Sequence, residues 1–179
     1  MIWGLRLFVG MAGVAVCVLA VPALAQTPGE AAREAIVDLC PELMLIKTPL
    51  AEDARIKARG FVVVDTRQHP RASTLDIVSK KVGDGEIWIA NSREGSFCQV
   101  SMLGTGTSEI FQSLLKEPGF YSDGLYPDPA SKDVKAGIET HEFRAPSEDG
   151  LYYGIQFVNP RGADPVAPLV VQQYAIEEE

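Results

Sequence analysis

Two stretches of alternating apolar and polar residues flank a turn-rich segment near the middle of the chain. The sequence reads IWIA at 87–90 and FCQV at 97–100, and turn-forming residues fill 91–96. A period of two is typical of strands with one buried face. The pattern therefore predicts a β-hairpin within 81–103, around which the other elements can be placed.

A helical repeat of apolar residues precedes this hairpin. Between 30 and 47, apolar side chains recur at spacings of three and four, with charged residues on the other side, which predicts an amphipathic helix. Pro41 has no amide hydrogen and restricts the residue before it, so a kink or break is expected there. The apolar stripe consists of Ala32, Ala35, Ile36, Leu39, Cys40, Leu43 and Met44.

Start and stop signals predict a second helix over 48–59. Thr48 can cap it, Pro49 stands at its first position and Gly60 follows its end. The apolar run at 61–64 predicts a short buried strand, and the polar residues 65–73 predict a loop.

The rest of the chain alternates strands, turns and one more helix. A strand is expected over 75–82 and a tight turn at 83–85. A helix is expected at about 107–117, with a Thr or Ser cap at its start, followed by a long Pro- and Gly-rich loop at 118–133. Further strands are expected over 137–144, 151–158 and 169–176.

Together these elements predict an α+β fold with an antiparallel sheet of about six or seven strands and helices on one face. The segment IWIANSREG at 87–95 is echoed by IQFVNPRG at 155–162, so the chain can be written as two α-βββ units, 30–104 and 105–179. The alternative is chance, because Asn and Gly are common in turns. Tandem helix-plus-sheet units resemble, in architecture alone, the secreted β-lactamase-inhibitor proteins. The resemblance implies a protein-binding surface, although the sequence carries no motif of that family.

The first 25 residues have the pattern of a secretory signal peptide. Arg6 precedes a long apolar run, and Ala-Leu-Ala at 23–25 resembles a cleavage site. The alternative is a retained membrane anchor, because the run approaches the length that spans a bilayer. Cleavage would leave one domain, 26–179, and we expect no stable membrane insertion of it. The location would be periplasmic or secreted, in a bacterium.

The charge of the chain limits its partners. Without residues 1–25, 15 basic residues face 24 acidic ones, a net charge of −9. Binding to nucleic acid depends on Lys and Arg contacts, so no nucleic acid partner is expected. The expected partner is an unknown protein or small ligand of the cell envelope, and the sequence indicates no cofactor.

Two cysteines, Cys40 and Cys98, remain after cleavage. In an exported protein such a pair predicts one disulfide, here closing a loop of 58 residues worth roughly 4 kcal/mol in the chain-entropy model. A metal site and a catalytic thiol are the alternatives. No C-x-x-C motif supports them, and the histidines are distant in sequence.

Two groups of residues could carry acid–base chemistry. Glu139 and His141 would share one face of a strand, a spacing that fits an acid–base pair or two metal ligands. The alternative is a solvated polar strand face. Asp65, His69 and Ser73 lie close together in one loop, but no G-x-S-x-G motif accompanies them, and a simple turn explains them. We therefore assign no catalytic residue and no metal ligand.

Two further segments could bind a partner. Gly104, Thr105, Gly106 and Thr107 join a strand to a helix N-terminus, where backbone amides favour anions, although ordinary capping also explains them. The predicted loop carries Phe120, Tyr121 and Tyr126, and aromatic side chains are favoured in recognition surfaces. The alternative is that these rings fold back over the core.

The sequence thus favours an exported, non-enzymatic domain that binds a protein or ligand. One alternative is a small envelope hydrolase or metal-dependent enzyme that uses Glu139, His141 or the 65–73 loop. Another is an inhibitor of a secreted enzyme, with the 118–133 loop as the inserting element.

Overall fold

The computed structural model describes residues 26–45, 48–65, 74–93, 97–104, 106–116, 126–135, 138–146, 151–160 and 169–177. The helices are α1 (Pro28–Glu34), the π-helical segment η1 (Ala35–Leu39), α2 (Cys40–Leu45), α3 (Ala54–Ala58) and α4 (Thr107–Lys116). The strands are β1 (Val62–Val63), β2 (Leu75–Val82), β3 (Gly85–Ser92), β4 (Phe97–Leu103), β5 (Tyr126–Lys135), β6 (Ile138–Pro146), β7 (Leu151–Pro160) and β8 (Leu169–Glu177).

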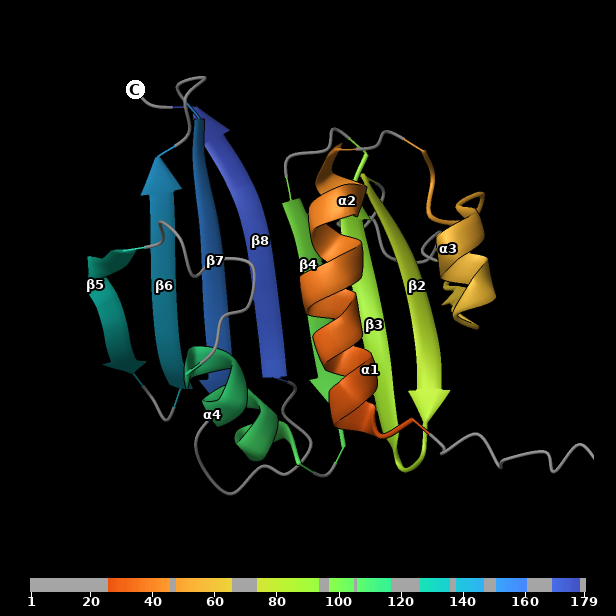
Figure 1. Cartoon of the computed structure of the whole chain (residues 1–179), viewed down its shortest axis with the longest axis horizontal. Helices are drawn as coiled ribbons and strands as arrows, with labels where there is room; N and C mark the ends of the chain where they lie inside the picture. Colours follow the sequence, from red (N-terminus) through yellow and green to blue (C-terminus); the bar gives the residue numbers. More distant parts are fainter. Residues whose placement is uncertain are drawn as a thin grey trace, which may run out of the picture.

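All of these strands form one antiparallel sheet in the order β1-β2-β3-β4-β8-β7-β6-β5. Figure 1 shows α1, α2 and α4 in front of the sheet and α3 beside the β2 edge. Seven of the strands have seven or more residues, and β1 has two. The predicted α+β class, with an antiparallel sheet of about six or seven strands and helices on one face, is confirmed.

The sheet has a symmetric centre. Cys98 pairs with Gln173 and Met102 pairs with Leu169, on either side of the pair Val100–Val171. Each half therefore contributes its last strand to the middle and its first strand to an edge. A duplication would produce this order with four strands in each unit. The duplication itself stays a prediction.

The N-terminal helical stretch contains a π-helical segment just before Pro41. In η1 the Cys40 N–H bonds to the Ala35 carbonyl, five residues back. The next bond in that register would need an N–H from Pro41, which has none. The Ile36 carbonyl instead accepts a hydrogen bond of 2.6 Å from the Gln173 Nε2 atom of β8. The predicted effect of Pro41 thus takes the form of a π-helical segment, with no break in the helix.

The core lies between the helices and the sheet. Alternate residues of β3 and β4 are buried on the helix side, among them Ile87, Ile89, Cys98, Val100 and Met102. Cys40 of α2 and Cys98 of β4 form a disulfide with a Cα–Cα distance of 5.5 Å. The predicted cysteine pair is confirmed, and it fastens the helix to the sheet.

Two predictions for residues 48–64 are wrong. The helix predicted over 48–59 is only α3, because the Asp53 carboxylate accepts the Arg55 N–H at 2.8 Å and starts the helix there. Residues 49–53 instead form turns that bury Leu50. The strand predicted as buried lies at the sheet edge, so Val62 and Val63 are 62% and 61% exposed.

The loop predicted over 118–133 is also partly wrong. Residues 126–133 belong to β5, an edge strand whose register shifts between Pro127 and Lys132. Prolines are tolerated on edge strands and at bulges, because their missing N–H can face away from the ladder. The prolines that suggested a loop are therefore compatible with an outer strand.

Candidate functional site

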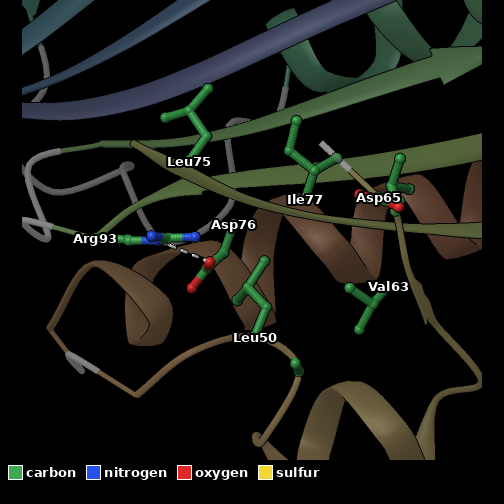
Figure 2. Close-up of a pocket in the computed structure, with 9 residues that line it drawn as sticks. Leu50, Val63, Asp65, Leu75, Asp76, Ile77 and Arg93 are labelled. Atoms are coloured by element: carbon green, nitrogen blue, oxygen red, sulfur yellow. Dashed lines mark hydrogen bonds and ion pairs between the residues drawn. The ribbon is translucent and has the colours of Figure 1, made fainter. Parts of the chain in front are cut away.

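A hollow lies at the β1 end of the sheet, and we call it the edge hollow. Its volume is about 370 Å³. Figure 2 shows the Arg93–Asp76 pair on one side, Val63 and Asp65 on the other, and Leu50 between them. The full lining is Leu50, Ala51, Val63, Val64, Asp65, Leu75, Asp76, Ile77 and Arg93.

Local structure fixes one wall of the edge hollow. The Glu52 N–H donates to the Pro49 carbonyl at 2.9 Å, and the Asp53 N–H donates to the Leu50 carbonyl at 3.3 Å. These turns place Leu50 against the core. The Arg55 side chain holds the pKa of Asp53 below its usual range by hydrogen bonding to that carboxylate. A charged Asp53 therefore anchors this wall and α3 together.

An ion pair lies at the rim of the edge hollow. The Arg93 Nε atom is 3.0 Å from the Asp76 Oδ1 atom, and the Arg93 N–H donates to the Thr74 carbonyl at 3.3 Å. The Arg93 guanidinium is mostly exposed, while the Asp76 carboxylate is half-buried. Exposed guanidinium donors can bind a carbonyl or carboxylate oxygen. The edge hollow therefore combines apolar walls with polar groups at its rim.

The Glu139–His141 pair lies on a largely covered face of β6. The His141 Nε2 and Glu139 Oε1 atoms are 2.8 Å apart, and the side chains are only 19% and 5% exposed. The Phe111 ring of α4 meets the His141 ring edge to face, with centroids 5.6 Å apart. The alternative of a solvated strand face is wrong, because these residues lie on the helix side of β6, where α4 packs. The pair does share one face, as the spacing predicts.

Of the other predicted site residues, the structure describes Gly104, Gly106, Thr107 and Tyr126. Gly104 and Gly106 have φ angles of 126° and 83°, and a side chain at Gly104 would collide with Gly85. Close packing and a left-handed backbone thus account for both glycines. Thr107 begins α4, and Tyr126 begins β5. The remaining predicted residues, Thr105, Phe120, Tyr121, His69 and Ser73, lie outside the described residues, as does the predicted signal peptide, so these binding predictions stay predictions.

Two further hollows are lined by described residues elsewhere. The sheet face opposite the helices has one of about 230 Å³, lined by Ile77, Trp88, Ala90, Gln99, Ser101 and Leu103. The end of α2 and the strands β7 and β8 form another of about 290 Å³, lined by Pro41, Met44, Leu45, Tyr153, Gly154, Gln173 and Tyr174. Neither hollow is lined by Glu139 or His141.

Sequence reasoning missed the edge hollow. Its residues come from four separate stretches, at 50–51, 63–65, 75–77 and 93, and no motif links them. The available signal was the run of valines at 62–64, which a buried strand explained equally well. The decisive fact is that this strand lies at the edge of the sheet.

Neither a metal site nor a membrane span is found in the described part of the chain. No group of three or more His, Cys, Asp or Glu side chains is arranged there to hold a metal ion. No described helix is both long and apolar enough to cross a bilayer. Comparisons with protein-family models, curated proteins and solved structures found no match to this chain. The resemblance to the β-lactamase-inhibitor proteins therefore rests on the arrangement of elements alone.

Proposed function

We propose that this chain is an exported, non-enzymatic domain that binds a protein or ligand of the bacterial cell envelope through the edge hollow. The observation that carries the proposal is the composition of that hollow. Its walls are apolar at Leu50, Val63 and Ile77, and its rim holds the Arg93–Asp76 ion pair. A concave apolar surface with a few oriented polar groups is the usual form of a binding site.

Export is supported by the leader-like sequence of residues 1–25 and by the disulfide between Cys40 and Cys98. Disulfides persist in the periplasm and outside the cell, where thiols are not kept reduced. The net charge of −9 after cleavage favours a partner that is not an anionic polymer.

The hydrolase alternative depends mainly on the Glu139–His141 pair. An acid–base pair must come within hydrogen-bond reach of its substrate. Both side chains are instead largely covered, and the Phe111 ring packs against His141. This geometry favours a structural role for the pair, in which the histidine provides a hydrogen-bond partner for a buried carboxylate.

Filling the edge hollow tests the proposal. Ala51 is exposed and lines the hollow, so Ala51→Trp should block it without disturbing the core. Ala58, exposed on α3 and outside the lining, offers the matched control Ala58→Trp. The measurement is quantitative mass spectrometry of proteins and small molecules retained from envelope extract by the oxidised domain.

A partner should be retained by the wild type and by A58W and lost from A51W. Both variants should unfold at the temperature of the wild type within a few degrees. Equal retention by all three proteins would refute the edge hollow as the binding site, and no retained partner would refute the binding function.

A further inference from the structure

The two edges of the sheet differ in how they are protected. Natural sheets guard an exposed edge by keeping the edge strand short or by placing prolines, charges or bulges on it, because unpaired main-chain groups invite another strand. The outer strand β5 has Pro127 and Pro129 and a register shift. The outer strand β1 has Val62 and Val63, both more than half exposed, and Val64 follows. The β1 edge is therefore apolar and carries neither a proline nor a charge between residues 62 and 64.

The register of β1 shows which main-chain groups face outward. Val62 pairs with Ser79, and the Val64 N–H donates to the Ile77 carbonyl at 2.9 Å. Main-chain groups alternate direction along an antiparallel strand. The N–H and C=O of Val63 therefore point away from β2. A further extended backbone can satisfy both groups at once, whereas a compact ligand cannot continue the ladder.

The edge hollow is continuous with this edge. Val63 and Val64 belong to the edge and also line the hollow, next to Leu50 and Ile77. Neighbouring strands lie about 4.8 Å apart, so a strand added to β1 would pass beside the hollow. One of its side chains would enter the apolar space, while the Arg93 guanidinium at the rim could bind a main-chain carbonyl of the same segment.

We propose that the occupant of this site is an extended segment of a partner polypeptide that adds to β1 as a ninth strand and places one apolar side chain in the edge hollow. The inference rests on the proposed function and names its partner class. Main-chain hydrogen bonds supply affinity in such complexes, and side-chain pockets supply specificity. A peptide partner also explains why exposed valines flank the hollow, because an added strand would cover them.

The direction of the Val63 N–H allows a specific test. Val63→Pro removes the outward donor and leaves the Val62 and Val64 bonds to β2 in place, so it should block strand addition while the fold persists. Val63→Thr is the matched control, because threonine keeps the N–H and the β-branched shape. The probe is a phage-displayed library of random twelve-residue peptides, selected on the oxidised wild-type domain.

Affinities of the selected peptides are then measured by fluorescence anisotropy. We expect V63P to weaken binding by about tenfold or more and V63T by less than about threefold, since one main-chain donor is lost only in the first. If the selected peptides bind V63P as tightly as the wild type and bind A51W more weakly, strand addition is overturned and the edge hollow remains as a binding site. Failure to select any peptide would also overturn it.

Self-association gives a further outcome. If analytical ultracentrifugation shows that the wild type is a dimer and that V63P is a monomer, the proposal of a separate partner is overturned, because β1 would then pair with β1 of a second copy. A wild type that stays monomeric at tens of micromolar, together with peptides that depend on the Val63 N–H, supports the proposal.

Discussion

Replacing Gln173 by leucine should show how the sheet completes the hydrogen bonding of the N-terminal helix. Gln173 is 2% exposed, and its Nε2 atom donates to the Ile36 carbonyl at 2.6 Å. Leucine is similar in size and has no donor, so the carbonyl would remain buried without its partner. Such a loss costs about 1–3 kcal/mol, which for a chain of this size lowers the melting temperature by about 2–12 °C.

The physical reason can be tested by a second substitution. Pro41→Ala restores the N–H that the π-helical register lacks, so the Ile36 carbonyl gains a donor from its own helix. Gln173→Leu should therefore cost about 1 kcal/mol less in the Pro41→Ala background than in the wild type. The free energy of unfolding would be measured by guanidinium denaturation of the four oxidised proteins.

Gln172→Leu is the matched control, because Gln172 points to the opposite face of β8 and should change stability by less than about 0.5 kcal/mol. An equal cost of Gln173→Leu in both backgrounds would show that the amide does not replace the missing proline N–H. A cost as small as that of the control would refute the hydrogen bond itself.

Three further predictions concern stability. The double variant Cys40→Ala, Cys98→Ala opens a loop of 58 residues, so its free energy of unfolding in guanidinium denaturation should be about 4 kcal/mol below that of the wild type. A decrease of less than about 1 kcal/mol would contradict this prediction. A Cβ at Gly154 would overlap the Tyr174 ring, so Gly154→Ala should cost about 1–3 kcal/mol, and adding Tyr174→Ala should recover part of the loss in thermal unfolding. The Arg55 guanidinium lowers the pKa of the Asp53 carboxyl in the folded state. The charged carboxylate therefore stabilises the fold fully above its unfolded pKa of about 3.9, and this stabilisation is lost as the pH falls through its folded-state pKa. Asp53→Asn, which keeps the helix cap, should thus be less stable than the wild type at pH 7 and converge with it as the pH approaches about 2; a constant difference would contradict the assignment.

The Tyr174 phenol illustrates how the packing of β6, β7 and β8 changes the chemistry of a side chain. Its hydroxyl donates to the Glu142 carboxylate, which also pairs with Arg144 at 3.0 Å. Burial and the hydrogen bond to Glu142 together raise the pKa of Tyr174 to about 12, although the nearby Arg144 acts to lower it. The phenol therefore stays protonated at any physiological pH and serves as a hydrogen-bond donor.

Local patterns were sufficient for the elements that are buried on one face. The alternation at 87–90 and 97–100 predicted the β3–β4 hairpin, and the helical spacing around Cys40 placed that cysteine toward the sheet. These patterns work because burial on one face selects apolar residues at the period of the element itself. The fold class and the cysteine pair follow from the same information.

The position of an element within the sheet is not a local property, and here the sequence was insufficient. A run of valines at 62–64 fits a central strand and an edge strand equally well, and the prolines of 126–135 fit a loop and an outer strand. The spacing of Glu139 and His141 indicated a shared face, but only the packing of α4 decided that this face is covered.

What the sequence by itself determined is therefore the type of the long elements that bury one face, β5 excepted, since type and buried face both depend on side chains a few residues apart. Only the tertiary structure decided that β1 is the outermost strand at one end of the sheet, and only it brought Leu50, Val63, Asp76 and Arg93 together around one hollow. The reason is physical: an edge and a hollow are defined by which distant segments pack beside a residue and which do not.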